Sequence, residues 1–265
     1  MRLGRIQNNY TAEGFDLVKN AGLDFIEICC NNAAEAQALV DAKDSVKKQI
    51  ERTGIDVSCV GRWNHEILCE GRLDEEKLAG YFALLDTAAA LGAKTFVCGC
   101  NLDPSLSLYQ NYTLAIDFFS RLIERAQGTG VKVAVQNCSW NNFIVSPEQW
   151  KVVLGELKDL WLKFDASHSY NRTKDHSYLE ELNHWGERVA HVHVKGTTHA
   201  GKPAVDDPPA GMDDIRWRPL FSLLYAKGYD GDLSIEPHSA TWHGPLGNAG
   251  IAFTRDFIRG FMLKA

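Results

Sequence analysis

Two short apolar runs carry polar residues at a spacing that could do chemistry, and the first covers residues 160–165. It has the length and residue types of a buried strand. Alternate side chains of a strand share one face, so Lys163 and Asp165 point to one side and the apolar residues between them to the other. His168 follows three residues after Asp165. An acid and an imidazole therefore stand at the end of one strand.

The second run, residues 188–196, repeats this pattern with His191, His193 and Lys195 on one face. Polar groups that point inward from apolar strands are costly unless they bind something. A lone inward histidine is more often a core residue that is satisfied by a hydrogen bond. An acid, an imidazole three residues later and a further imidazole on the next strand favour a metal site.

The elements that must position these residues alternate along the whole chain, with a strand followed by a helix about every 30 residues. Several of the helices end at a glycine. Strands are expected at 3–6, 23–30, 55–60, 93–100, 131–135, 160–165, 188–196 and 233–236. Helices are expected at 11–20, 33–53, 74–91, 108–127, from 147, at 177–185, 219–227 and 251–262.

Strict alternation of this kind requires parallel strands joined by crossover helices. Eight such pairs in 265 residues predict a closed (β/α)8 TIM barrel that forms one domain over residues 1–265. A doubly wound open sheet is the second reading, but no glycine-rich nucleotide loop follows the first strand.

Composition excludes several classes of function. A net charge of −6 without any basic run argues against nucleic acid or an anionic membrane as a partner. The first residues lack the apolar region of a signal peptide, and no stretch approaches a membrane span. Seven cysteines, an odd number, are typical of reduced thiols in a cytoplasm.

In such barrels the active site lies at the carboxyl ends of the strands. Strands five to eight are neighbours in the wall, so polar side chains at their ends can converge on one point. Oxygen ligands from Gln136, Asp165 and Glu236 with one imidazole from His193 suit a hard or borderline ion. Mn²⁺ is the first choice, and Mg²⁺, Co²⁺ or Zn²⁺ would also fit.

The order of elements and three motifs resemble the xylose-isomerase-like TIM barrels. The motifs are Asp165-x-x-His168, the strand His191-Val-His193-Val-Lys195, and Ser234-Ile-Glu236-Pro, and the likeness covers nearly the whole chain. This superfamily includes sugar phosphate isomerases and epimerases, hydroxypyruvate isomerases, inosose dehydratases, keto-sugar lyases and apurinic endonucleases. The resemblance leaves a homo-oligomer open, because dimers and tetramers are common among these proteins.

The resemblance implies a metal held by Glu, Asp, His and Glu from strands five to eight. Asp165, His193 and Glu236 match three of these positions, and Gln136 stands where the family has the first glutamate. An amide oxygen can bind a metal, but it carries no charge and cannot accept a proton as a carboxylate does. A second departure is Gly196, which stands where many members have an acid.

Other polar and aromatic residues are expected near the mouth of the barrel. Trp63 and His65 end the third strand and could stack on, and hydrogen-bond to, a sugar ring. His199 and Lys202 lie in the long loop before residue 217, and His238, Trp242 and His243 follow the last strand. A solvated loop position is the alternative for His199 and Lys202. Glu27 falls where the family often has an inward acid, and the alternative for it is an ion pair inside the barrel.

The leading interpretation is a metal-dependent enzyme that isomerises or epimerises a sugar or keto-sugar by removing a proton next to a carbonyl. Glu236 or His168 would move the proton, and Lys195 would hold or protonate an oxygen. Because one glutamate of the usual pair is missing, a lyase or dehydratase acting on a 3-keto-sugar, 3-keto-glycoside or inosose is the alternative. A non-catalytic sugar-binding barrel is the third reading, and a DNA-repair endonuclease is disfavoured by the lack of a basic face.

Overall fold

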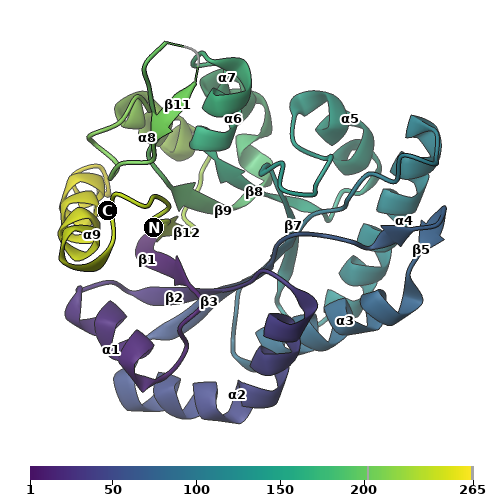
Figure 1. Ribbon diagram of the computed structural model, residues 1–265, viewed down its shortest axis with the longest axis horizontal. Helices are drawn as coiled ribbons and strands as arrows, with labels where there is room; N and C mark the ends of the chain where they lie inside the picture. Colours follow the sequence, from purple (N-terminus) through teal and green to yellow (C-terminus); the bar gives the residue numbers. More distant parts are fainter. Residues whose placement is uncertain (202, 264–265) are drawn as a thin grey trace.

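Eight parallel strands close into a barrel in the computed structural model, which describes residues 1–201 and 203–263. Helices surround the ring of strands, as Figure 1 shows. The TIM-barrel fold expected from the sequence is therefore confirmed. In chain order the barrel strands are β1 (Arg2–Gln7), β2 (Phe25–Cys30), β3 (Asp56–Arg62), β6 (Thr95–Cys98), β7 (Lys132–Gln136), β8 (Trp161–Asp165), β9 (Val189–Val194) and β12 (Asp232–Ile235).

The helices begin and end where the sequence offers caps. Asn32 accepts a hydrogen bond from the backbone N–H of Glu35 at the start of its helix, and Gly54 ends that helix in the left-handed conformation. Ser107 and Gln110 form a reciprocal capping box. The helices that follow barrel strands are α1 (Ala12–Asn20), α2 (Ala33–Thr53), α3 (Glu75–Ala90), α4 (Leu108–Ala126), α5 (Pro147–Glu156), α6 (Ala166–Thr173), α7 (Tyr178–Trp185), α8 (Trp217–Ala226) and α9 (Gly244–Arg259).

Three parts of the chain differ from the pattern expected from sequence. The last helix starts at Gly244 and not at Ile251, because glycines in its first turns allow close packing: a Cβ on Gly247 would lie 2.6 Å from the Trp242 carbonyl oxygen. The short helix α6 follows β8 directly, capped by Asp165. Two hairpins also occupy loops: β4 (Leu68–Cys69) with β5 (Arg72–Leu73), and β10 (Thr198–His199) with β11 (Ala204–Asp206).

The core has two parts of different character. A large apolar cluster fills the space between the strands and the helices. A much smaller one lies inside the barrel around Cys59, Trp63, Val97 and Ala134. Charged and ionisable residues are also buried in the interior, among them Glu27, His65, Lys163, Asp165, His191 and His193. Among the residues described, none of the helices combines the length and apolar composition that crossing a bilayer requires.

The barrel closes where the first strand meets the last. Arg2 of β1 lies opposite Asp232 of β12, and its guanidinium donates two hydrogen bonds to that carboxylate, at 2.9 and 2.8 Å. The hydroxyl of Ser58 donates a third. Burial opposes ionisation of Asp232, but the bonds from Arg2 and Ser58 outweigh it and lower the pKa of the carboxyl. The seam therefore depends on an ionised and largely buried acid.

We expect Asp232→Asn to lower the free energy of unfolding by about 1.5–3 kcal/mol at neutral pH, because charge-assisted hydrogen bonds are lost. Urea denaturation measures this loss. The pKa of Asp232 is lower in the folded protein than in the unfolded chain. Its ionisation therefore stabilises the fold when the pH is above the unfolded-state pKa, and this stabilisation is lost as the pH falls through the folded-state pKa. The difference between the two proteins should therefore shrink below about pH 4.

Asp56→Asn is the matched control, because Asp56 also contacts Arg2 but is 56% exposed. Exposed ion pairs contribute little, so this variant should lose less stability. Equal losses in the two variants would contradict the assignment of the buried acid as the group on which the seam depends.

Candidate active site at the carboxyl ends of the strands

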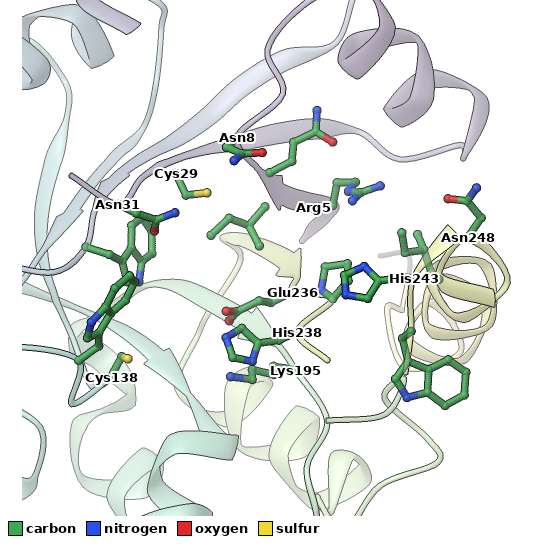
Figure 2. A pocket seen from close by; sticks show the side chains of 18 of the residues that line it. Arg5, Asn8, Cys29, Asn31, Cys138, Lys195, Glu236, His238, His243 and Asn248 are labelled. Carbon is green, nitrogen blue, oxygen red and sulfur yellow. The ribbon is translucent and has the colours of Figure 1, made fainter. Parts of the chain in front are cut away.

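A cavity of about 770 Å³ opens at the end of the barrel where the parallel strands finish. Figure 2 shows three polar side chains gathered near its middle, Glu236, Lys195 and His238. The other lining residues come mainly from the ends of β1, β2, β3 and β7 and from the start of α9: Arg5, Ile6, Gln7, Asn8, Cys29, Asn31, Trp63, Cys138, Trp140, His168, Pro237, Trp242, His243, Gly244, Gly247, Asn248 and Ile251.

Asp165 is the last residue of β8 and also caps α6. Its Oδ1 accepts hydrogen bonds from the backbone N–H and hydroxyl of Ser167, at 2.9 and 2.7 Å. Its Oδ2 has no hydrogen-bond partner among the described residues and lies 3.4 Å from His168 Nε2. Burial opposes ionisation, but attraction to His168 and to Lys163 lowers the pKa of Asp165. One carboxylate oxygen is therefore fixed and the other is free.

His193 stands opposite Asp165 on β9 and contacts carboxylates through both ring nitrogens. Its Nδ1 lies 2.8 Å from Glu236 Oε2 and 3.9 Å from Asp165 Oδ2. Its Nε2 lies 3.0 Å from each carboxylate oxygen of Glu27. Burial opposes a charge on the ring, but Glu27 and the hydrogen bond to Glu236 raise the pKa of His193.

Glu236 follows β12 and faces the cavity. Burial opposes its ionisation, but the charge of Lys195 and the hydrogen bond with His193 hold its pKa well below the ordinary value. Burial likewise opposes a charge on Lys195, whereas Glu236 and Asp165 raise its pKa. The site therefore holds a carboxylate beside an ammonium group.

His168 completes this group. Ligand atoms of Asp165, His168 and Glu236 all lie within 4.8 Å of one another. Burial lowers the pKa of His168 to about 4, against the opposing effect of Asp165. The imidazole is consequently neutral near pH 7 and can both accept and donate a proton.

Gln136 and His65 form a neutral pair on the opposite side of the site. The Gln136 amide nitrogen lies 2.9 Å from His65 Nε2, and His65 Nδ1 lies 3.0 Å from the Tyr81 hydroxyl oxygen and 3.4 Å from the backbone nitrogen of Gly99. Burial, with a smaller effect from Arg62, lowers the pKa of His65 to about 3. Gln136 Oε1 is buried and has no hydrogen-bond partner among the described residues.

The structure brings some of the expected substrate contacts to the cavity and not others. Trp63 lines it, with its ring 6.4 Å from that of His193 and nearly parallel to it. His238 lines it as well and is hydrogen-bonded to Asp207. His65 lies fully buried behind Gln136. His199 bonds to Asn171 away from the lining residues, and Lys202 lies outside the described residues.

Sequence reasoning did not assign a role to several residues that the structure places at the site. Lys163 shares a strand face with Asp165, which is the signal that could have identified it. Arg5, a charged residue within the first strand, lines the cavity. Trp242 and His243, which were expected near the mouth of the barrel, line it as well. Glu27 proves to be hydrogen-bonded to His191 and His193 inside the barrel.

The residues present fit a divalent cation. Asp165 Oδ2 and Gln136 Oε1 are buried acceptors without donors, and buried acceptors of this kind call for a cation or water. His193 Nδ1 and Glu236 Oε2 lie beside Asp165 Oδ2. Glu27 binds His193 Nε2, which leaves Nδ1 as the ligand atom, the usual arrangement of a carboxylate behind a metal-bound histidine.

Comparison with known proteins agrees with this architecture. The model of the family "Xylose isomerase-like TIM barrel" matches residues 15–259. Uncharacterized protein MJ1311 of Methanocaldococcus jannaschii is 26% identical over 142 residues, which are 49% of this chain and 46% of that protein. The chain therefore spans about half the length of this curated relative.

Several solved structures share the fold at low sequence identity. D-Psicose 3-epimerase from Clostridium cellulolyticum H10 superposes with a TM-score of 0.78 at 15% identity, over 100% of both chains. The 3-keto-D-glucoside 4-epimerase YcjR from E. coli superposes with a TM-score of 0.74 at 20% sequence identity, over 98% of this chain and 99% of that one. The IolI protein, whose structure contains a zinc atom, superposes with a TM-score of 0.75 at 16% sequence identity, over 98% of this chain and 99% of that one.

We expect Glu27→Gln to lower the pKa of His193, because the anion that most strongly favours the imidazolium is removed. Histidine NMR of the chelator-treated protein over a pH series measures the shift. The pKa of His193 is higher in the folded protein than in the unfolded chain. Protonated His193 therefore stabilises the fold when the pH is below the unfolded-state pKa, and this stabilisation is lost as the pH rises through the folded-state pKa.

Glu13→Gln, in the exposed first turn of α1, is the control and should leave the His193 titration as it is. An unchanged His193 pKa in Glu27→Gln would mean that Glu27 does not determine the protonation of this ring.

Proposed function

Because the chain belongs to the family of xylose isomerase-like TIM barrels, we propose that it is a divalent-metal-dependent isomerase or epimerase acting on a sugar or keto-sugar. The observation that carries the proposal is the meeting of Asp165, His193 and Glu236 beneath a cavity that Lys195 also lines. Mn²⁺ is the ion we favour, since three of the four proposed ligands, Gln136, Asp165 and Glu236, offer an oxygen and only His193 offers a nitrogen.

The reaction would begin with removal of a proton from the carbon next to a carbonyl. Glu236 is suited to be the base, because it faces the cavity and its lowered pKa keeps it ionised. A bound divalent ion would polarise the carbonyl or the adjacent hydroxyl and stabilise the negative charge that develops. Lys195, whose pKa is raised, would hold the substrate oxygen or donate a proton to it.

A carbohydrate is the proposed substrate. The cavity is large enough for a monosaccharide or glycoside and combines polar groups with indole rings at Trp63, Trp140 and Trp242. Aromatic faces of this kind pack on the apolar face of a sugar ring. Among the proteins of similar fold are epimerases of D-psicose and of a 3-keto-D-glucoside, which supports a keto-sugar or keto-glycoside as the guest.

A lyase or dehydratase acting on a 3-keto-sugar, 3-keto-glycoside or inosose is the second candidate, and Gln136 favours it. Epimerisation by a pair of glutamates needs a carboxylate on each side of the reacting carbon. Here one of the two positions carries an amide whose N–H is committed to His65. Elimination needs one base and an acid for the leaving group. Glu236 and Lys195 supply both, and His168, neutral near pH 7, is suited to act as a base.

Incubation with a panel of keto-sugars in D₂O tests the proposal. If the protein is an isomerase or epimerase, NMR should detect deuterium bound to carbon in the recovered substrate or product. If it is an eliminase, a conjugated product that absorbs in the ultraviolet should form with release of water or an aglycone.

Glu236→Gln should reduce either reaction by at least about 100-fold, because an amide cannot accept the proton. The exposed acid Glu124 provides the control variant Glu124→Gln, which should retain full activity. Turnover of a substrate with neither carbon-bound deuterium nor elimination would refute the carbanion mechanism.

The metal part of the proposal predicts that His193→Ala loses bound metal while the barrel remains folded. Elemental analysis after exposure to Mn²⁺ and gel filtration measures the metal, and circular dichroism checks the fold. His184→Ala, on the exposed side of α7, should keep the metal content of the wild type. Full metal retention by His193→Ala would show that this imidazole is not a ligand.

A further inference from the structure

Three buried polar atoms beneath the cavity lack hydrogen-bond partners among the described residues: Gln136 Oε1, Lys163 Nζ and Asp165 Oδ2. Gln136 stands directly opposite Lys163 in the parallel register of β7 and β8. Lys163 and Asp165 lie on the same face of β8, with side chains 1% and 0% exposed. An ammonium nitrogen, a carboxylate oxygen and an amide oxygen are therefore buried on neighbouring strands without a hydrogen-bond partner among the described residues.

The ammonium of Lys163 is the unusual member of this group. Its nitrogen lies 3.7 Å from Asp165 Oδ2, which is beyond hydrogen-bond length but close enough for strong attraction in a medium of low dielectric constant. A buried ammonium without hydrogen bonds is costly and persists only where its charge is needed. The need here is evident, since the Asp165 carboxylate is itself fully buried and the Glu236 carboxylate contacts the same His193 ring beside it.

We propose that Lys163 competes with the divalent ion for the Asp165 carboxylate and thereby sets a weak, exchangeable metal affinity. The inference rests on the metal site of the proposed function. Without the ion, the ammonium balances the charge of the Asp165 carboxylate and thereby stabilises the folded barrel. With the ion bound, the same positive charge repels it, because two cations then share one carboxylate.

Gln136 also weakens the metal affinity of the site. A carboxylate opposite Lys163 would cancel the ammonium and leave Asp165 and Glu236 to the ion, whereas the amide adds no charge. Around the same point the chain therefore has a neutral amide at Gln136 and a positive charge at Lys163, and both leave less negative charge for the ion. As a consequence, occupancy of the site follows the concentration of free metal by mass action, and the metal-free protein remains folded.

The test is Lys163→Met, which keeps the length of the side chain and removes its charge. Chelator-treated protein is titrated with Mn²⁺ by calorimetry, and thermal unfolding is followed with chelator and with saturating Mn²⁺. Affinity for Mn²⁺ should rise at least about tenfold. The midpoint of unfolding should fall relative to the wild type in chelator and reach or exceed it in saturating Mn²⁺.

Two further variants accompany this one. Lys132→Met removes an exposed charge from β7, where the ammonium lies 3.7 Å from the centre of the Trp161 ring, and should leave the Mn²⁺ affinity unchanged. Lys163→Gln also removes the charge but keeps a polar group that can bond to Asp165. It should show the same rise in affinity, and it carries the test if the methionine variant does not fold.

The outcomes separate the inference from the proposed function. Equal Mn²⁺ affinity in the wild type and in both neutral variants overturns the inference and leaves the metal site standing. A loss of stability that is the same with and without Mn²⁺ also overturns it, because a merely structural lysine would behave in that way. Failure of all these proteins to bind Mn²⁺ or Zn²⁺ overturns the metal part of the proposed function and the inference with it.

Discussion

Carboxylates enclosed in the barrel must have positive partners nearby, and this constraint orders the whole interior. Glu27 is completely buried, yet its pKa lies well below the ordinary value because two imidazoles outweigh the effect of burial. His191 Nε2 lies 2.7 Å from it and His193 Nε2 lies 3.0 Å from it. The other ring nitrogen of His193, Nδ1, is hydrogen-bonded to Glu236 at the cavity. The interior and the site are thus one electrostatic unit.

Closure of the barrel is what makes this unit possible. Strands β2 and β9 are not neighbours in the wall, because β1 and β12 lie between them. Glu27 and His191 can therefore meet only across the interior, although 164 residues separate them in the chain. At the other end of the barrel, the pair of Arg2 and Asp232 joins the first strand to the last. A separated β1 and β12 would open the interior to water and weaken every charge pair inside it.

The site that results is asymmetric. The side built by β8, β9 and β12 carries the charges, with Asp165 and Glu236 next to Lys195. The side built by β3 and β7 is neutral, because His65 is uncharged and Gln136 is an amide. Proton transfer is therefore expected from one side of a bound substrate only. This asymmetry sets the chain apart from a site with a carboxylate on each face, whatever the product of the reaction.

Local sequence determined the alternation of strands and helices, because side-chain period and capping residues act over a few positions. It also placed Asp165, His193 and Glu236 at the ends of neighbouring strands, where the structure brings them together. The start of α9 at Gly244 carries opposing local signals. Pro245 in its first turn favours a helix start, whereas its glycines disfavour a helix, and the close packing of Gly247 against Trp242 depends on the tertiary structure.

Tertiary structure alone decided what each polar side chain does once it is inside. The sequence placed His65 with Trp63 near a substrate, but the fold buries it between Tyr81 and Gln136. It showed Lys163 on the face of Asp165, yet not that the ammonium would find no hydrogen-bond partner in the described part of the chain. These outcomes depend on partners contributed by distant strands. Periodicity gives the direction of a side chain, whereas its charge state and bonds follow from what the closed barrel brings to meet it.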